Sequence, residues 1–347
     1  MKVKITKSIS LDKFIDNSLY NKKCGYYMKK NPFGKKGDFI TAPNISILFS
    51  EMISIWIIAL WKKLKKPKKI NIVELGAGNG EMMLNIIKTS NQFLFFKKAC
   101  NFFIFEKSPY LKKIQKEKLK NYEVRWLKKI IKINNSPTIF IGNEFFDSLP
   151  IKQFTKKNSN WYEKYIDISS KNKKFLEKKV NIKKIEKKIG INIAKNQEFI
   201  EFSPLMIDLL KKILTIVNKK NGGLLIIDYG YFNKKMFNTL QSVKNHKKIN
   251  TLNDISNSDI THLLNYKLIE TIVKKMKLKV SGLSTQRNFL IKLGILERAE
   301  IIAKNLPFLK KANIYYRLQR LIDNKQMGEI FKVMFISNRK INFKLGF

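Results

Sequence analysis

The stretch Ile70-Asn71-Ile72-Val73-Glu74-Leu75-Gly76-Ala77-Gly78-Asn79-Gly80-Glu81 decides the fold, because an apolar strand runs into an acid and a loop with glycine at every second position. A dinucleotide loop has the spacing G-x-G-x-x-G and binds a pyrophosphate, whereas here the third glycine comes one residue early and Glu81 stands in its place. Carboxylates at Glu74 and Glu81 would repel a pyrophosphate but attract the sulfonium and ammonium groups of S-adenosylmethionine. We therefore predict that S-adenosylmethionine is bound by Glu74, Gly76, Ala77, Gly78 and Gly80.

A second strand end supports a ligand that contains adenosine. The run 101–106 is apolar and ends in Glu106, about one βαβ unit beyond the glycine loop. A parallel sheet would bring Glu106 beside that loop, where its carboxylate can accept hydrogen bonds from both ribose hydroxyls. For the glycine motif taken alone, a loop that serves only tight packing remains the alternative.

Apolar runs recur along the chain, with helical patterns between most of them. They cover 70–75, 101–106, 122–126, 138–142, 222–228, 277–282 and 330–336. This alternation predicts an α/β protein with a Rossmann-like parallel sheet that is covered on both faces. Ligands of such sheets bind at the carboxyl ends of the strands.

Three segments need separate interpretation. Residues 1–69 precede the sheet and are expected to form a cap or lid, with 70–347 as the cofactor-binding domain. Between 151 and 203, short lysine-rich segments indicate an insertion between the fourth and fifth strands, folded as a small antiparallel sheet. The most apolar window, 45–61, is too short and too polar for a membrane span and predicts a buried helix.

The net charge of +44 could indicate binding to RNA, DNA or an anionic membrane. Only six of the 70 cations are arginines, however, and specific nucleic-acid readers depend on arginine for bidentate contacts. The lysines are spread over the whole chain among isoleucine and asparagine. A compositional drift of the surface therefore explains the charge better than a nucleic-acid partner does.

Cysteine and histidine are scarce. Cys24 and Cys100 form no disulfide framework, and His246 and His262 have no cysteine neighbours that would complete a metal site. Residues 1–17 lack the continuous apolar core of a secretory signal. We expect no metal and no transmembrane segment, and a location in the bacterial cytoplasm or, if the chain is organellar, in the mitochondrial matrix.

Further segments match one family pattern in order along nearly the whole chain. They lie at 25–27, 31–34, 37–43, 49–51, 74–80, 106–109, 143–150, 228–231, 239–241, 246, 259–261, 285–286, 289–290, 293–295 and 327–329. Together they resemble the MidA-like family of class I S-adenosylmethionine-dependent methyltransferases, whose mitochondrial members are complex I assembly factors and protein arginine methyltransferases. The resemblance implies a seven-stranded class I methyltransferase sheet with an N-terminal helical cap, and a protein substrate.

Two positions depart from that family pattern. Asn44 stands where the family usually has a glutamate that completes a capping box, so Thr41 is expected to cap the helix start alone. Asn265 stands where the family usually has an acid. If that acid touches substrate, its replacement weakens the case for substrate binding.

The turn Asn143-Glu144-Phe145-Phe146-Asp147 follows the strand at 138–142, whose end faces the cofactor methyl group in a sheet of this kind. A guanidinium group is protonated at ordinary pH and has no lone pair ready to attack. Neighbouring carboxylates can hold its planar fork and accept the departing proton. We predict Glu144 and Asp147 as catalytic residues and Asn143 as a cofactor contact; a helix cap at Glu144 and a simple turn at Asp147 are the alternatives.

Other cleft residues are predicted with structural alternatives. Trp126 would border the adenine or pack in the core, and Asp228 would face the cleft or cap the following loop. Tyr26, Tyr27 and the turn 37–39 would close over the cofactor or pack as core aromatics.

The leading hypothesis is a protein arginine methyltransferase that acts on a subunit of respiratory complex I during assembly. The cofactor is predicted from residues of this chain, whereas the target is implied by the resemblance alone. Two alternatives remain: a non-catalytic assembly factor on a methyltransferase fold, motivated by Asn44 and Asn265, and an RNA methyltransferase, motivated by the lysine excess.

Overall fold

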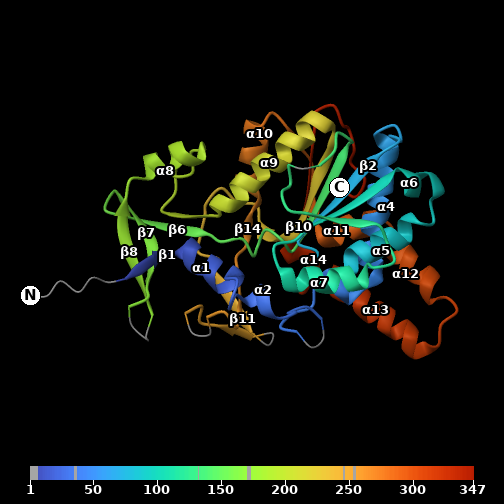
Figure 1. Cartoon of the computed structure of the whole chain (residues 1–347), viewed down its shortest axis with the longest axis horizontal. Helices are drawn as coiled ribbons and strands as arrows, with labels where there is room; N and C mark the ends of the chain where they lie inside the picture. The colour runs from blue at the N-terminus through green and yellow to red at the C-terminus, as the bar shows by residue number, and fades with distance from the viewer. Residues whose placement is uncertain (1–6, 35–36, 132, 170–172, 245–246, 253–254) are drawn as a thin grey trace, which may run out of the picture.

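A computed structural model describes residues 7–34, 37–131, 133–169, 173–244, 247–252 and 255–347, so His246 lies outside the described residues. All seven predicted strands are present in one sheet (Figure 1). They are β2 (Ile70–Leu75), β3 (Cys100–Phe105), β4 (Val124–Leu127), β5 (Thr138–Asn143), β10 (Gly222–Tyr231), β15 (Lys279–Thr285) and β16 (Phe331–Ser337). Their order is β15-β16-β10-β5-β2-β3-β4, with the short β14 (Leu264–Asn265) beside the end of β10.

The sheet is parallel except at its last strand. β4, β3, β2, β5 and β10 pair in parallel, whereas β16 runs antiparallel to both neighbours and fills the place between β10 and β15. The carboxyl ends of β2, β3, β5 and β10 therefore lie along one edge. That edge carries the glycine loop and the turn after β5.

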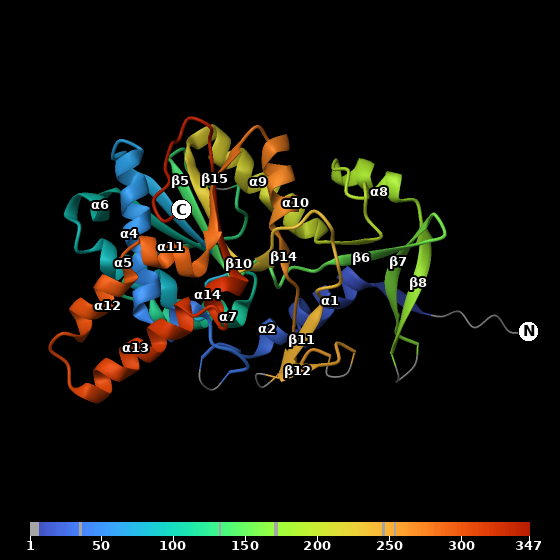
Figure 2. The same ribbon diagram turned by 180° about the vertical axis from the view of Figure 1, so that it is seen from behind.

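Helices cover both faces of this sheet, as predicted (Figures 1 and 2). Side chains alternate along β2, so Ile70 and Ile72 pack on one face while Val73 and Leu75 pack on the other. The first face is covered by α4 (Ile47–Lys63), α5 (Glu81–Ser90) and α11 (Gln286–Lys292), and the second by α9 (Pro204–Lys220) and α10 (Tyr266–Lys275). α4 is the predicted buried helix, and its Trp56 is fully buried.

The remaining helices lie around this layer. They are α6 (Leu94–Ala99), α7 (Pro109–Lys118), α12 (Ile295–Ala303), α13 (Phe308–Ile322) and α14 (Met327–Ile330). Within the described ranges, no helix combines the length and apolarity needed to cross a bilayer.

The predicted insertion forms a second, antiparallel sheet at one end of the molecule (Figure 1). It contains β6 (Lys152–Lys157), β7 (Asn160–Asp167), β8 (Lys174–Val180) and β9 (Phe199–Phe202). The helix α8 (Ile182–Ile189) lies between β8 and β9 in the sequence. The N-terminal β1 (Ser8–Ser10) adds to its edge by pairing with β7. The N-terminal segment is thus bound to the insertion by backbone hydrogen bonds.

A third group of elements lies over the carboxyl edge of the main sheet. α1 (Leu11–Tyr20) and α2 (Tyr26–Lys29) share an apolar cluster with the three-stranded sheet β11 (Gln241–Lys244), β12 (Lys247–Ile249) and β13 (Asp259–Thr261). We call α1, α2 and this small sheet the lid. The short α3 (Ala42–Ile45) connects the lid to α4.

Candidate active site

A cavity of about 660 Å³ lies between the lid and the carboxyl edge of the main sheet. Its wall includes Gly76 and Gly78 after β2, Glu106 after β3, and Glu144 and Asp147 after β5. The sheet thus brings together most of the predicted site residues, which are far apart in sequence. The volume lies within the range of pockets that bind small molecules and cofactors.

The glycine loop adopts a backbone that other residues avoid. Gly76, Gly78 and Gly80 have φ of +65°, +51° and +80°. A Cβ atom at Gly76 would lie 2.5 Å from the Phe145 ring, and one at Gly78 would lie 3.3 Å from the Phe33 ring. Both the left-handed conformation and the close approach therefore require glycine here.

Glu74 and Asn143 present unpaired oxygens beside this loop. Glu74 is only 3% exposed, and its Oε2 and the Asn143 Oδ1 have no hydrogen-bond partner among the described residues. Both side chains line a small recess next to the cavity, whose wall also includes Ala77. Burial, together with the charge of Glu106, raises the pKa of Glu74 to about 8. A positively charged ligand would relieve this cost, so the recess fits the ammonium and sulfonium of S-adenosylmethionine.

Glu81 lines the same recess as Glu74, as predicted, but it does not supply the expected free charge. Glu81 forms an ion pair with Lys118, with Nζ and Oε2 2.5 Å apart, so its charge is already compensated. Glu106 is the acid whose charge acts on Glu74. The electrostatic argument for a cationic cofactor therefore holds with Glu106 in place of Glu81.

Gln115 connects Glu106 to the glycine loop. Its Nε2 donates to Glu106 Oε2 at 3.1 Å and to the carbonyl of Gly78 at 2.9 Å, while Ser108 N–H donates to Glu106 Oε1 at 2.9 Å. Trp126 donates to Gln115 Oε1 at 2.9 Å. Trp126 does not line the cavity, where Leu127 lies instead. Gln115 was not predicted: it is fully buried in the structure, but the sequence shows only a glutamine on the lysine-rich helix α7.

Asp228 shapes the turn after β5. Its Oδ2 accepts hydrogen bonds from the N–H groups of Phe146 at 3.1 Å and Asp147 at 3.3 Å, and its Oδ1 accepts from Tyr229 N–H at 3.0 Å. Asp228 is fully buried and is absent from the cavity wall. Asp228 therefore does not face the cleft, and it caps the turn after β5 rather than the loop that follows its own strand.

Glu144 has φ of +50°, which is unusual for a residue other than glycine. Its Oε1 accepts from Ala42 N–H and from Asn143 Nδ2, both at 3.2 Å. Withdrawal from solvent and the charge of Asp147 raise the pKa of Glu144 to about 8. The carboxylate thus lines the cavity and also satisfies a backbone donor at the start of α3.

The prediction that Thr41 alone caps α3 is wrong. Thr41 makes no side-chain cap, and its Oγ1 instead accepts from Asn44 Nδ2 at 2.7 Å. Asn44 Oδ1 in turn accepts from Asn79 Nδ2 at 2.8 Å. Asn44 thus connects α3 to the glycine loop. A glutamate could also accept from Asn79, but it could not donate to Thr41 Oγ1 as Asn44 does.

Asp147 presents one oxygen without a protein partner. Tyr229 OH donates to Oδ2, whereas Oδ1 is buried and has no hydrogen-bond partner among the described residues. Burial raises the pKa of Asp147, against the lowering effects of the Tyr229 hydrogen bond and of His262. Asp147 can therefore accept a donor from a molecule in the cavity.

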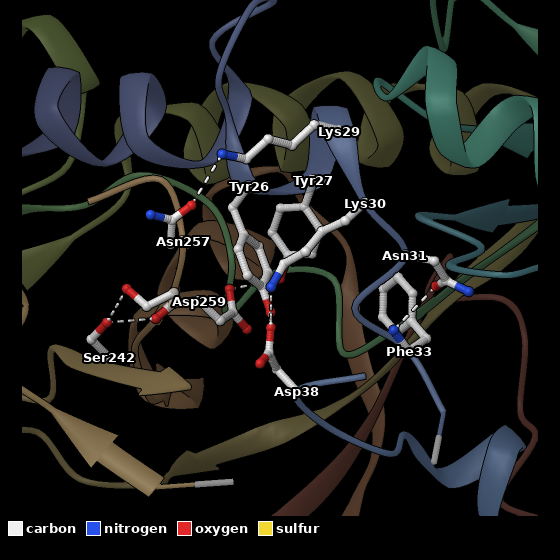
Figure 3. Close-up of polar contacts among 11 residues, drawn as sticks. Tyr26, Tyr27, Lys29, Lys30, Asn31, Phe33, Asp38, Ser242, Asn257 and Asp259 are labelled. Carbon is white, nitrogen blue, oxygen red and sulfur yellow. Dashed lines mark hydrogen bonds and ion pairs between the residues drawn. The ribbon is translucent and has the colours of Figure 1, made fainter. Parts of the chain in front are cut away.

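Asp259 is the acid of the cavity wall that the sequence reasoning did not assign to the site. It begins β13 in the lid and accepts a hydrogen bond from Tyr27 OH at 2.8 Å (Figure 3). In the sequence, Asp259 stood out only as one of the residues that match the family pattern. Asn265, in contrast, accepts from Leu268 N–H at 3.0 Å as the cap of α10 and is absent from the cavity wall. The departure at Asn265 therefore removes no carboxylate from the cavity.

The lid closes over the glycine loop with aromatic side chains. The Tyr27 ring stacks on Tyr20 and Phe33, with centroids 5.6 Å and 6.4 Å away. Tyr26 OH and Lys30 Nζ each lie 2.6 Å from Asp38 Oδ2, which fastens the segment after α2 (Figure 3). Tyr26 is fully buried in the apolar cluster of the lid and absent from the cavity wall, as the core-packing alternative predicts, whereas Tyr27 and Phe33 line the cavity.

Metal ligation has no support in the part of the chain that the structure describes. There, no three histidine, cysteine, aspartate or glutamate side chains are grouped as ligands.

Comparisons with known proteins agree with this geometry. The family described as "Putative S-adenosyl-L-methionine-dependent methyltransferase" matches residues 52–284. A Xenopus laevis protein named protein arginine methyltransferase NDUFAF7, mitochondrial, is 28% identical, and the match covers 95% of this chain and 81% of that protein. The human protein of the same name is 25% identical over 95% of this chain and 80% of its own length.

A solved structure has the same fold. It is a Burkholderia thailandensis protein bound to S-adenosyl-homocysteine, with a TM-score of 0.82 and 20% identity, and the match covers 98% of this chain and 90% of that chain. A native crystal structure of a protein from the same organism gives a TM-score of 0.79.

Proposed function

This chain belongs to the family of S-adenosyl-L-methionine-dependent methyltransferases, and on that premise we propose that it methylates an arginine side chain of a protein. The names of its curated relatives support this acceptor. The family resemblance implies a subunit of respiratory complex I as the substrate, with action in the mitochondrial matrix or, for a bacterial protein, in the cytoplasm.

The observation that carries the proposal is the position of Glu144 and Asp147. Both carboxyls line one cavity beside the glycine loop, and Asp147 keeps one buried oxygen unpaired among the described residues. A guanidinium fork presents parallel N–H donors that match such carboxylates.

The residues divide into two roles. Glu74, Asn143 and the glycine loop would hold the methionine part of the cofactor, and Glu106 would hold the ribose. The cofactor supplies an electrophilic methyl group when bound. Glu144 and Asp147 would orient the arginine nitrogen toward it and accept the proton that the nitrogen loses, while the aromatic lid excludes water.

Product analysis tests this proposal. The full chain is incubated with isotope-labelled S-adenosylmethionine and purified complex I subunits, and the products are analysed by mass spectrometry. We expect labelled methylarginine that is lost in Glu144→Gln. The control Glu198→Gln changes an exposed partner of Lys156 and should leave the product unchanged. Methylarginine that persists in Glu144→Gln would contradict the assigned role.

One observation favours a second candidate function. Glu144 already accepts a hydrogen bond from Ala42 N–H, as a purely structural carboxylate would. A non-catalytic assembly factor would bind the same subunit and the cofactor without turnover. Stable co-purification of the subunit with the native chain, with no methylated product, would support that alternative.

A further inference from the structure

We propose that Asp259 and Asp147 form the two arms of a clamp for a guanidinium cation, and that binding of this cation expels protons from the cavity. The inference rests on the proposed arginine substrate and assigns its binding residues. We call Glu144, Asp147 and Asp259 the acid cluster.

The acid cluster comes from two distant parts of the chain. Glu144 and Asp147 belong to the turn after β5, whereas Asp259 is carried in by β13 of the lid. All three line the same cavity. Because the lid supplies one arm and the sheet edge supplies the other, a cation between them would bridge the two parts of the molecule.

The unpaired oxygen of Asp147 points to a donor-rich ligand. Asp147 is 5% exposed, and its Oδ1 finds no hydrogen-bond donor among the described residues. A buried carboxylate oxygen without a donor is costly, and a guanidinium offers five N–H donors in a rigid fork. Asp259 Oδ1 accepts from Tyr27 OH, and the Ile260 backbone N–H also interacts with this carboxyl, so the side chain is held in place on the cavity wall.

Burial favours the protonated form of the acid cluster before a cation enters. Loss of solvent, with the added charge of Asp147, raises the pKa of Glu144 to about 8 and that of Asp259 to about 7. The other titratable groups that face the cluster or line the cavity are Tyr20, Tyr26, Tyr27, Asp38, Glu106, Lys107, Lys112, Lys128, Asp228, Tyr229 and His262. Lys107 already pairs with Asp16, so it does not neutralise the cluster.

Proton release follows from the charge of the ligand. A guanidinium cation favours the ionised form of each carboxyl, so a cluster carboxyl loses its proton to the solvent when the cation binds. A citrulline side chain has nearly the same shape but is neutral, and it would leave the protons in place. Proton release therefore separates recognition of charge from recognition of shape.

The test is calorimetric titration of the full chain saturated with S-adenosyl-homocysteine, at about pH 6.5, where Glu144 and Asp259 are mostly protonated. The probes are N-acetyl-arginine methylamide and N-acetyl-citrulline methylamide, each in phosphate and in imidazole buffer. The difference in heat between buffers gives the number of protons released. We expect about one proton released per arginine probe and none for the citrulline probe.

Two variants assign the effect to Asp259. Asp259→Asn should weaken binding of the arginine probe by about tenfold or more and reduce proton release. Tyr27→Phe, which frees the Asp259 side chain, should weaken it by a smaller factor. Asp208→Asn, an exposed acid paired with Lys212, is the matched control and should change neither. Unchanged affinity for S-adenosyl-homocysteine reports that each variant is folded.

The clamp is refuted if Asp259→Asn binds the arginine probe as tightly as the native chain with the same proton release, or if the citrulline probe binds equally well. Its failure is distinguishable from that of the proposed function. Probe binding with proton release but no methylarginine product removes the function and keeps the clamp. Methylation by Asp259→Asn with an unchanged KM removes the clamp and keeps the function.

Discussion

The active-site cavity and the outer surface carry charge of opposite sign and use it differently. The chain has a net charge of +44, yet four acids line its cavity: Glu106, Glu144, Asp147 and Asp259. On the surface, acids are paired with lysines, as Asp208 is with Lys212, and such exposed pairs contribute little to stability. Lys107, Lys112 and Lys128 also line the cavity, but Glu144 and Asp259 form no ion pair with a cation among the described residues, and burial raises the pKa of both. The net charge therefore reflects the lysines of the solvated surface, whereas the acids, which are fewer, mark the site.

The largest expected effect comes from removing the charge of one cavity acid, Asp147. Asp147→Asn keeps the volume and the contact to Tyr229 but removes the negative charge that would hold a guanidinium. We expect kcat for arginine methylation to fall roughly 10²–10³-fold. The surface control Asp208→Asn should retain native kcat. If the kcat of Asp147→Asn stays within about threefold of native, Asp147 is not a catalytic residue.

The next effect tests the cofactor wall of the cavity. Gly78→Val places a side chain where φ is +51° and where even a Cβ would meet the Phe33 ring at 3.3 Å. We expect the Kd for S-adenosylmethionine to rise about 100-fold, measured by calorimetry. Gly190→Val is the matched control, because Gly190 has φ of +72° but ends α8 in the insertion. Native affinity in Gly78→Val would move the cofactor away from this loop.

A smaller effect concerns pH and stability. Glu74 and Glu144 have a pKa near 8 and Asp259 near 7, whereas unfolded carboxyls have a pKa of about 4. The native chain therefore binds more protons than the unfolded chain between these values, so the free energy of unfolding falls as pH rises toward 8. We expect it to be lower at about pH 8.5 than at about pH 5.5 by at least about 2 kcal/mol, the change that Asp259 alone would give, in urea titrations without cofactor.

The variant Glu74→Gln sharpens this measurement. It removes one raised pKa, so the difference in free energy between the two pH values should shrink relative to the native chain. The exposed variant Asp208→Asn should leave the difference unchanged. A native stability that rises toward pH 8 would show that the cavity carboxyls are ionised before any ligand binds.

The smallest effect concerns the lysine-rich surface. α8 carries Lys183, Lys184, Lys187 and Lys188, far from the cavity wall. Replacing all four with glutamine should leave kcat and cofactor affinity within about twofold of native, because solvated charges at this distance are screened. A large loss of activity, together with RNA binding that weakens steeply with salt, would restore the surface as a functional face.

The sequence predicted those parts of the site that depend on local pattern. The strands at 70–75 and 138–142 are continuous apolar runs, and the acids at their ends mark the cavity because parallel strands end at one edge. Glu106 follows the same rule. The spacing of Gly76, Gly78 and Gly80 in the sequence already indicates the tight loop in which all three have positive φ.

Contacts between distant segments could not be predicted in this way. Asp259 is bound by Tyr27, 232 residues earlier, and no spacing or periodicity connects a lid helix to β13. Glu144 reaches Ala42, 102 residues earlier, and so replaces the local cap expected from Thr41. Trp126 was expected at the adenine because it ends a strand, but side chains alternate along a strand and Leu127 takes the cavity side. These contacts depend on tertiary packing between distant segments, which a short window of sequence cannot predict.

The position of β16 has a consequence for biosynthesis. β16 follows both β10 and β15 in the sequence yet lies between them in the sheet, so β10 gains this neighbour only after residues 331–337 have been synthesised. Until then the edge of β10 is an open template for pairing with other chains. β10 also carries Asp228, which holds the turn after β5. Nascent chains that stall before residue 331 should therefore be inactive and prone to aggregation.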